Sequence, residues 1–242
     1  MIEDPKDVAP ASPPPRRISL EDFRPRTLEE IVGQPAVVAR LQRLAAGVRH
    51  GGIIPASLLF HGPPGIGKTT AARAFGRAVL NEEFANSFTE LKAFDDRSPR
   101  RMTEMILDSR KTPMRGAPVR ILFFDEIETL TQEAQNALRP GMEGEGGTTM
   151  FVLACNELTG VSKPMISRCT VLEFTPLEAE AMRELLRRAL RVASLQVPPS
   201  TIDRIREEAR GFPREAIKLL LEEVGSLSSG SRRAPDVPPV PP

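Results

Sequence analysis

The amino-acid sequence predicts an α/β fold, in which a parallel sheet flanked by helices is followed by a small lid domain of three helices. Three apolar runs, "SLLFHG", "VRILFFDE" and "TMFVLACN", are continuous rather than alternating, as is typical of strands buried on both faces. Longer helical patterns separate these runs, which favours parallel strands joined by crossover helices. After Phe174 the pattern becomes helical only, so the lid is expected to begin near that residue.

The helices are expected where apolar residues recur every three or four positions. In the core this periodicity predicts helices over residues 34–48, 69–80, 100–111 and 131–138. In the lid, Thr175 is the expected N-cap of the first helix, with Pro176 at its first position and Glu178 completing a capping box. The next two stretches, "PSTIDRIREEARG" and "PREAIKLLLEEVG", each end in a glycine suited to a helix C-cap.

Proline content marks the expected domain boundaries. Five of the 24 prolines fall within residues 1–15 and five more within residues 234–242, where little apolar surface is available for burial. The sequence therefore predicts a disordered tail at 1–20, an α/β domain at 21–175, the lid at 176–225 and a second disordered tail at 226–242.

Charge, cysteine content and hydropathy exclude several classes of protein. The 33 Lys and Arg residues balance 32 Asp and Glu residues to a net charge of +1, which gives no general attraction for nucleic acid or membranes. Two cysteines are too few for a disulfide framework and indicate a reduced, intracellular chain. No apolar run approaches the roughly 18 residues that cross a bilayer, so we expect a cytoplasmic protein without a membrane partner.

The stretch "GPPGIGKTT", residues 62–70, matches the phosphate-binding pattern G-x-x-x-x-G-K-[ST]. Its glycines let successive backbone N–H groups point at phosphate oxygens, and the helix that follows adds the positive end of its dipole. Lys68 is expected to reach the β and γ phosphates, and the Thr69 hydroxyl to take one position around Mg²⁺. The expected nucleotide-binding residues of this loop are Gly62, Pro63, Pro64, Gly65, Ile66, Gly67, Lys68, Thr69 and Thr70.

Polar side chains end the second and third apolar strands. "ILFFDEIETL" places Asp125 and Glu126 at the carboxyl end of a buried strand, where ligands bind in such sheets. We expect Asp125 to hold Mg²⁺ with Thr69, and Glu126 to orient and deprotonate the water that attacks the γ phosphate. The Asn156 amide can donate to the γ phosphate or to the attacking water, but an asparagine at a strand end also forms turns, and the residues alone leave both interpretations open.

Five segments, "FRPRTLEEIVGQ", "GPPGIGKTT", "FFDEIETLTQEAQNALRPGME", "LACNELTGVSKPMISRCTVLEF" and "GFPREAIKLL", occur in the order and spacing of a known family. Together they resemble the small subunits of replication factor C and related sliding-clamp loaders, which are AAA+ ATPases. The similarity covers about residues 23–224, and its most specific element is the Ser-Arg-Cys triplet at 167–169. The resemblance implies an AAA+ P-loop ATPase core with ATP and Mg²⁺ as cofactors.

The resemblance also implies roles for individual residues. Arg168 matches an arginine that projects from one subunit into the ATP site of the next, whereas its own sequence surroundings favour a bond to its own helix end. Arg214 matches a lid arginine that contacts phosphate within the same subunit, and Asn156 matches the polar sensor residue. The segment that resembles the adenine-binding side of the family contains Arg24, Val32 and Gly33. The expected catalytic residues are therefore Lys68, Glu126, Asn156, Arg168 and Arg214.

DNA contacts are implied less strongly. The family holds primer-template DNA through backbone amides and basic residues at helix starts, which position the DNA without reading its sequence. The matching residues are Arg97, Arg100, Arg101 and, on the central helix, Arg139. A solvated helix end explains the first three equally well. In the central helix Pro140 replaces a second arginine of the family, and because proline costs about 3 kcal/mol in a helix, we expect a kink or an end near Arg139.

The sequence thus predicts an ATP-hydrolysing clamp-loader subunit at a replication fork, with other clamp-loader subunits, a sliding clamp and primer-template DNA as partners. The family continues after the lid into a helical collar, whereas this chain continues into "SLSSGSRRAPDVPPVPP", which favours the alternative of a helicase loader or another replication or repair remodelling ATPase. A branch-migration motor is a weaker alternative. A scaffold that binds ATP without hydrolysing it is a further one, against which the presence of Glu126 argues.

Overall fold

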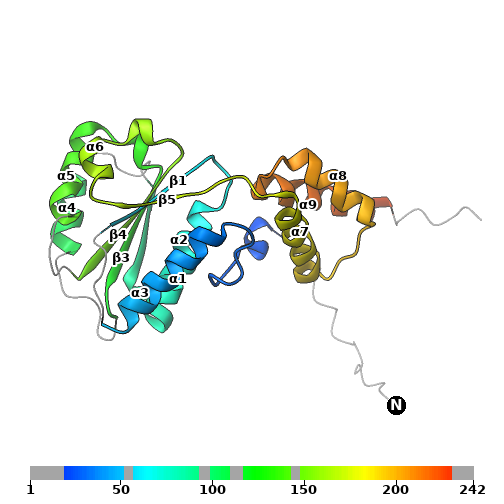
Figure 1. Ribbon diagram of the computed structural model, residues 1–242, viewed down its shortest axis with the longest axis horizontal. Helices are drawn as coiled ribbons and strands as arrows, with labels where there is room; N and C mark the ends of the chain where they lie inside the picture. The colour runs from blue at the N-terminus through cyan, green and yellow to red at the C-terminus, as the bar shows by residue number, and fades with distance from the viewer. Residues whose placement is uncertain (1–18, 52–56, 93–98, 110–116, 143–147, 231–242) are drawn as a thin grey trace, which may run out of the picture.

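The computed structural model describes residues 19–51, 57–92, 99–109, 117–142 and 148–230, which form an α/β core and a helical lid (Figure 1). Within these residues, five parallel strands form one sheet in the order β2-β3-β4-β1-β5. The strands are β1 (Ser57–His61), β2 (Phe88–Lys92), β3 (Arg120–Asp125), β4 (Thr149–Cys155) and β5 (Thr170–Glu173). The predicted parallel sheet is confirmed, and β2 and β5 are strands that the sequence analysis did not predict.

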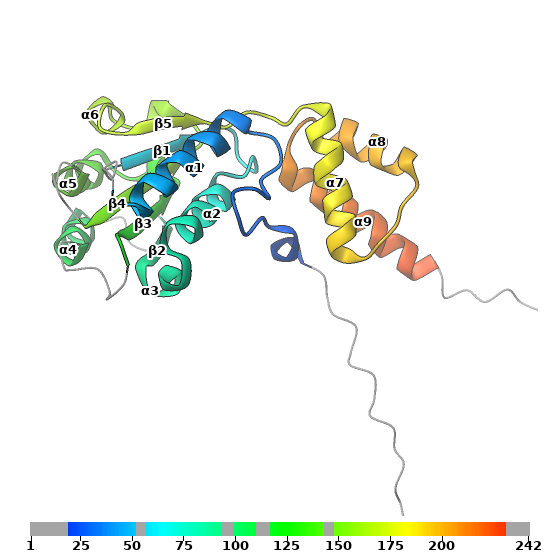
Figure 2. The ribbon, with the colours of Figure 1, turned by 60° about the horizontal axis from the view of Figure 1, so that its bottom comes forward.

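Helices cover both faces of the sheet, as Figure 2 shows. One face carries α1 (Pro35–Arg49), α2 (Lys68–Leu80) and α3 (Phe84–Ser87), and the other carries α4 (Pro99–Ser109), α5 (Gln132–Met142) and α6 (Lys163–Ile166). Four short 3-10 helices join the elements within the described residues: η1 (Leu20–Phe23), η2 (Asn81–Glu83), η3 (Ile127–Thr129) and η4 (Leu158–Gly160). The four core helices predicted from periodicity are therefore present, apart from residues 110 and 111, which lie outside the described part of the chain.

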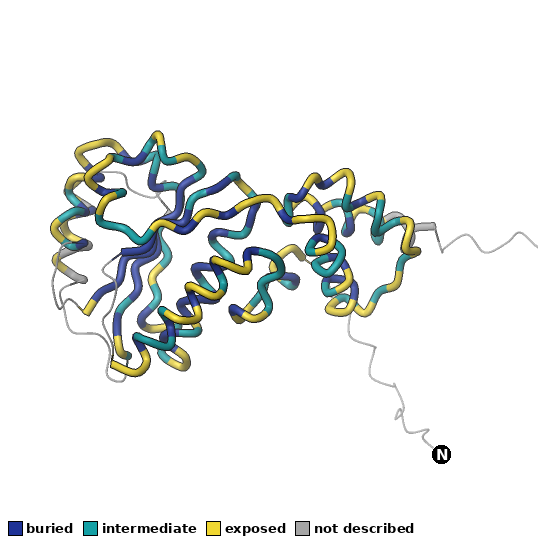
Figure 3. Tube along the Cα trace, in the orientation of Figure 1, coloured by how far each residue is buried: buried dark blue, intermediate teal, exposed yellow. Residues whose placement is uncertain are grey.

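The side chains of the three central strands, β1, β3 and β4, are buried on both faces, as the dark strands in Figure 3 show. Along β1, Leu58 and Phe60 pack into the cluster beneath α1 and α2, whereas Leu59 packs into the cluster beneath α5 and α6. This alternation is the reason that the sequence of β1 is apolar throughout, because successive side chains of a strand point to opposite faces. The same pattern buries every residue of β4.

The sheet register brings three functional segments to one edge. His61 pairs with Cys155 across β1 and β4, and Phe124 pairs with Leu153 across β3 and β4. Because these strands are parallel, the segments that follow their carboxyl ends lie side by side. The phosphate loop after β1 therefore adjoins the end of β3 and the end of β4.

The lid consists of α7 (Ala179–Ala193), α8 (Pro199–Ala209) and α9 (Pro213–Gly230). Its core includes Leu186, Ile205 and Leu220, and Phe23 of η1 also belongs to it although it is far away in the sequence. Phe174 packs in the core of the sheet and Leu177 in the core of the lid, so the chain passes from one to the other between these residues. Within the described residues, none of the helices combines the length and apolar character needed to cross a membrane.

The first lid helix begins later than predicted. The expected capping box at Thr175 is wrong: α7 starts at Ala179, and its N-cap Glu178 makes no side-chain capping bond. The backbone of Thr175 instead bonds to the side chain of Gln34, which donates to its carbonyl oxygen at 2.5 Å and accepts from its N–H at 3.3 Å. Leu177 N–H donates to the carbonyl oxygen of Gly211 at 2.8 Å. These long-range bonds hold the linker out of the helix.

Two helix ends also differ from the sequence prediction. α5 does not end at Arg139 but runs to Met142 with Pro140 inside it, and the alternative of a kink at this point stays a prediction. Leu138 and Met142 on the same helix are buried in the core, so packing offsets the hydrogen bond that proline removes. α9 continues through Gly225, the expected C-cap, to Gly230, five residues beyond the predicted end of the lid. Of the predicted tails at 1–20 and 226–242, residues 1–18 and 231–242 lie outside the described residues, whereas Leu20 begins η1.

Candidate nucleotide-binding site

A cleft between the core and the lid contains most of the residues predicted to bind nucleotide. Its charged and polar lining comes chiefly from the carboxyl edge of the sheet and from the start of α9: Lys68, Thr69, Asp125, Glu126, Asn156 and Arg214. Its apolar lining comes from η1 and the lid: Leu20, Phe23, Leu185, Pro213 and Ile217. One end thus suits a charged phosphate chain and the other a flat, apolar base.

The phosphate loop owes its shape to its glycines. Gly62, Gly65 and Gly67 have φ angles of 145°, 79° and 111°, a region that side chains rarely adopt. A Cβ on Gly62 would lie 2.2 Å from the carbonyl oxygen of Phe174, so no larger residue fits there. Ile66 is buried in the core and anchors the loop, whereas Pro64, Gly65, Gly67 and Thr70 line the cleft.

Lys68 is the buried cation of the site. Its ammonium group donates to the carbonyl oxygens of Gly62 and Pro63, at 2.6 and 3.1 Å, and to Oδ1 of Asn156 at 3.0 Å. Burial lowers the pKa of Lys68, and the nearby carboxylates of Asp125 and Glu128 partly oppose this effect. The bond to Asn156 joins the phosphate loop to the end of β4, which supports the interpretation of Asn156 as more than a turn former.

Thr69 and Asp125 form the pair predicted to hold Mg²⁺. The Thr69 hydroxyl donates to Oδ2 of Asp125 at 2.7 Å. Among the described residues no cluster of three His, Cys, Asp or Glu side chains is available to hold a metal alone. One carboxylate and one hydroxyl nevertheless fit Mg²⁺, which prefers hard oxygen ligands and takes the rest from water and substrate phosphates.

Glu126 has a constrained backbone at the mouth of the cleft. Its φ and ψ of 57° and 44° are left-handed, and its N–H donates to Oδ1 of Asp125 at 3.1 Å. Such a conformation costs roughly 1–3 kcal/mol in a residue other than glycine and is found preferentially at functional sites. The sharp turn directs the chain from β3 into η3 and leaves Glu126 lining the cleft.

The lid contributes Arg214 to the site. The Arg214 backbone N–H donates to the carbonyl oxygen of Gly65 at 3.3 Å, and its side chain lines the cleft. On the opposite side, Arg24 and Phe23 line the cleft from the N-terminal segment. Gly33 lies elsewhere: it lines a second cleft, where a Cβ would sit 2.4 Å from Cδ2 of Leu177. Val32 lines neither cleft, so the predicted adenine-binding role of Val32 and Gly33 stays a prediction.

Arg168 lies at the other edge of the sheet from the phosphate loop. It precedes Thr170, which pairs with Leu58, whereas the phosphate loop follows His61. Three residues of strand separate these levels, or about 10 Å at the usual rise. The Arg168 guanidinium donates to the carbonyl oxygen of Pro164 in the preceding helix, α6, at 2.6 Å, and it does not line the cleft of its own chain.

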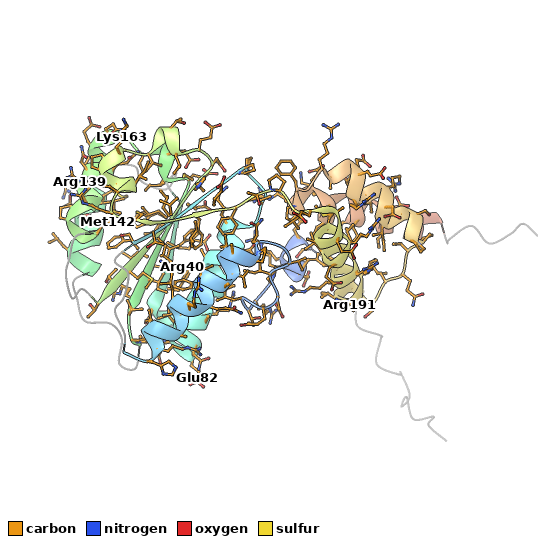
Figure 4. All side chains as sticks on the ribbon, in the orientation of Figure 1. Arg40, Glu82, Arg139, Met142, Lys163 and Arg191 are labelled. Carbon is orange, nitrogen blue, oxygen red and sulfur yellow. The ribbon has the colours of Figure 1, made fainter. Side chains whose placement is uncertain are left out.

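The described residues predicted to contact DNA lie on α4 and α5, which pack against each other. Arg97 lies outside the described residues. Arg100 and Arg101 begin α4, and the Arg100 side chain is 90% exposed and pairs with Glu104 at 3.1 Å. Figure 4 shows Arg139 on the end of the core away from the lid.

Sequence reasoning missed Glu128, which follows the carboxylate pair by two residues. Its Oε1 accepts a hydrogen bond from the backbone N–H of Asn156 at 2.8 Å. It also missed Gln135, a fully buried side chain of α5. Gln135 donates to the carbonyl oxygen of Gly160 at 2.9 Å and accepts from the N–H of Ser162 at 2.9 Å. A polar residue between apolar ones on a helix is the signal available for Gln135, but the pattern offers none for Glu128.

Comparison with known families defines the class of the core. Residues 58–177 match the family model described as "ATPase family associated with various cellular activities (AAA)". This segment includes the phosphate loop, both carboxylates at the end of β3, Asn156 and Arg168. The core is therefore an AAA domain.

Individual relatives point to a narrower group of proteins than the AAA family model does. The chain is 40% identical over 204 residues to the replication factor C small subunit of Methanoculleus marisnigri, and 37% identical over 204 residues to that of Archaeoglobus fulgidus. Each match covers 84% of this chain and 62% of the relative, so the chain spans about three fifths of the length of these proteins. The predicted resemblance is confirmed: the chain is a homologue of replication factor C small subunits.

Solved structures support the fold. Thermotoga maritima RuvB, described as a Holliday junction branch migration motor, is 25% identical with a TM-score of 0.73, over 87% of this chain and 68% of that one. A point variant of the same motor gives a TM-score of 0.74 at 24% identity, with the same coverage. This likeness extends over both the core and the lid.

Proposed function

We propose that this chain is an ATP-hydrolysing subunit of a clamp-loader assembly, which opens a ring-shaped sliding clamp and places it on primer-template DNA. The observation that carries the proposal is the meeting of Lys68, Asn156 and the Thr69–Asp125 pair in one cleft closed by the lid. The relatives named replication factor C small subunit favour clamp loading among the functions of AAA domains. We expect the assembly to act in the cytoplasm, at the replication fork.

Each side chain in the cleft has a separate task in ATP hydrolysis. Lys68 binds the β and γ phosphates, while Thr69 and Asp125 would hold Mg²⁺, which would supply positive charge to the phosphate chain. Glu126 accepts the proton of the attacking water. Asn156 and Arg214 contact the γ phosphate from the sheet and from the lid, so that hydrolysis alters contacts on both sides of the cleft.

Arg168 acts on the neighbouring subunit. Its place at the amino edge of the sheet, away from the phosphate loop of its own chain, supports a role in another chain's site. A guanidinium keeps its charge at every physiological pH and presents several donors in a fixed plane. It can therefore stabilise the charge that develops on the transferred γ phosphoryl group, as arginines supplied by a second protein do in other ATPases and GTPases. ATP turnover then requires assembly.

A second candidate function keeps the ATPase and changes its substrate. The likeness to a branch migration motor and the AAA domain itself are also compatible with a helicase loader or another remodelling ATPase of replication and repair. Identity to that motor is 25%, against 40% to a clamp-loader subunit, so clamp loading is the better supported function.

Steady-state ATP hydrolysis tests the proposal. Turnover would be measured across protein concentration, with and without primer-template DNA and the ring clamp of the same organism, and with Lys68→Met as the inactive control. We expect turnover per chain to rise with concentration and to be stimulated by DNA and clamp together. Turnover that rises with concentration but ignores both would reject clamp loading and favour the remodelling ATPase. The absence of turnover at every concentration would favour a scaffold.

A further inference from the structure

Glu128 connects the loop after β3 to the end of β4. It lies on η3, two residues after Glu126, and does not line the cleft. Its Oε1 accepts the backbone N–H of Asn156 at 2.8 Å, although 28 residues separate the two in sequence. The side chain of Asn156 in turn accepts a hydrogen bond from Lys68 at 3.0 Å. Glu128 is therefore one residue removed from the phosphate-binding lysine.

Glu128 is half-buried as a residue, and its two carboxylate oxygens differ in their surroundings. Its second oxygen, Oε2, is buried and accepts no hydrogen bond within the described part of the chain. A buried carboxylate oxygen without a donor opposes folding, because it has lost water and gained no replacement. A residue that only braced η3 would not need a charge here.

The charge of Glu128 reaches the phosphate site. Together with Asp125, it opposes the lowering of the Lys68 pKa that burial causes. It also adds to burial in raising the pKa of the Cys155 thiol, next to Asn156. The Glu128 carboxylate thus acts on two residues of the phosphate site. It accepts a hydrogen bond from the backbone of Asn156, and its negative charge interacts electrostatically with Lys68.

The fold fixes the position of Glu128 by close packing. A Cβ on Gly160 of η4 would lie 2.6 Å from Cβ of Glu128 and 3.3 Å from its Cα and carbonyl oxygen. Only glycine at 160 therefore lets η3 and η4 approach closely enough for the carboxylate to reach Asn156. A larger residue at position 160 should therefore displace Glu128 while leaving its carboxylate unchanged.

We propose that Glu128 is a positioning residue for ATP hydrolysis: it fixes the end of β4, and so holds Asn156 and Lys68 where the γ phosphate is recognised. The inference rests on the ATPase function proposed above. Glu128 does not touch the nucleotide, and it acts on the reaction through Asn156. A loss of Glu128 should therefore weaken recognition of the γ phosphate more than binding of the rest of the nucleotide.

Glu128→Ala is expected to lower kcat about 10- to 100-fold, the range for the loss of one hydrogen bond to a charged group, with KM changed less than about threefold. The preference for ATP over ADP, measured with fluorescent analogues of both, should fall several-fold. Glu128→Gln keeps an oxygen that can accept a hydrogen bond from the Asn156 N–H but has no charge. Its kcat should therefore lie between that of the wild type and that of Glu128→Ala. Glu157→Ala is the matched control, because this exposed carboxylate directly follows Asn156 after β4 and accepts a hydrogen bond from Thr159 at 3.3 Å.

Two further variants separate positioning from a general loss of structure. Gly160→Ala should reproduce the fall in kcat with the carboxylate intact. In an Asn156→Ala background, Glu128→Ala should cause little additional loss if it acts through Asn156. If Glu128→Ala does not fold, Gly160→Ala and Glu128→Gln decide the question, provided that their melting temperatures stay near that of the wild type.

The outcomes distinguish this inference from the proposed function. Wild-type turnover together with undiminished kcat in Glu128→Ala and Gly160→Ala would overturn the positioning role and leave the ATPase standing. Wild-type protein that binds ATP without hydrolysing it would overturn the ATPase, and the ratio of ATP to ADP affinity would still test Glu128. Equal losses in ATP and ADP affinity for Glu128→Ala would contradict a role at the γ phosphate.

Discussion

Arg214 of the lid donates its backbone N–H to the carbonyl oxygen of Gly65 in the phosphate loop, 3.3 Å away. A Cβ on Gly65 would lie 3.2 Å from Cβ of Arg214, and Gly65 has a φ of 79°. The loop and the lid thus touch where only glycine fits without strain. The conformation of the phosphate loop and the position of the lid are therefore coupled.

Gly65→Ala should raise the Kd for ATP about tenfold or more. The left-handed backbone costs an alanine about 1–2 kcal/mol, and each 1.4 kcal/mol is tenfold in affinity. Titration with a fluorescent ATP analogue measures the change. Gly47→Ala is the control, since a Cβ at that position in α1 meets nothing within 4 Å. It should leave the Kd unchanged and stabilise the helix by about 0.5–1 kcal/mol. An unchanged Kd in Gly65→Ala would contradict the coupling.

Arg214→Ala should weaken ATP binding about 10- to 100-fold and ADP binding less. The side chain lines the cleft, and a charged hydrogen bond to the γ phosphate contributes about 1.5–3 kcal/mol. Lys218→Ala on the same helix is the control, because Lys218 is half exposed and pairs with Glu215 at 3.5 Å. Parallel losses for the two nucleotides would place Arg214 away from the γ phosphate.

The lid is tied to the core by Arg188, which donates to the carbonyl oxygen of Glu30 and pairs with its carboxylate at 2.7 Å. Only 19% of the Arg188 side chain is exposed, so Arg188→Ala should lower the free energy of unfolding by about 1–3 kcal/mol. Arg191→Ala, which removes a pair with Glu184 from a side chain 64% exposed, should change it by less than about 0.5 kcal/mol. Urea unfolding measures the loss of stability in each variant. Equal losses in Arg188→Ala and Arg191→Ala would contradict a stabilising role for the contact between Arg188 and Glu30.

The two cysteines should react slowly in the folded protein. Burial raises the pKa of both Cys155 and Cys169 from 9.0 to about 12, so little reactive thiolate is present at pH 8. A thiol reagent should modify both cysteines much faster in urea, which unfolds the protein, than in buffer alone. Between pH 9 and 12 the folded state binds more protons than the unfolded state, so the stability that these thiols contribute below pH 9 is lost as the pH rises. The free energy of unfolding of Cys169→Ala should therefore fall less steeply than that of the wild type between pH 9 and 12. Rapid labelling of both thiols without urea would contradict their protection by the fold.

The phosphate site was predictable because its chemistry requires a fixed spacing. The pattern from Gly62 to Thr69 and the carboxylates after a buried strand are required by the geometry of phosphate and magnesium binding. They can therefore be recognised in the sequence without knowledge of the fold. β2, "FTELK", was missed because a polar edge strand lacks the continuous apolar pattern of a central one. β5 was missed because it has four residues, too few to show a period.

The remaining errors are tertiary effects. Thr175 carries a good capping pattern, but its backbone bonds to Gln34, 141 residues away, and local propensity does not register such a contact. Pro140 stays inside α5 because the neighbouring side chains are buried. Glu128 is an acidic residue among several until the fold brings it to the Asn156 N–H. Each outcome depends on which distant segments meet.

In the proposed mechanism, Arg168 of one chain completes the ATP site of another. Arg168→Ala and Glu126→Ala would each be assayed alone and then mixed, with ATP binding and co-assembly measured in parallel. We expect each variant to bind ATP, to assemble and to hydrolyse almost nothing. The mixture should recover part of the activity, because some interfaces pair an intact Glu126 with an intact Arg168 from the neighbour. A co-assembled mixture that stays inactive would show that Arg168 does not complete the ATP site of a neighbouring chain.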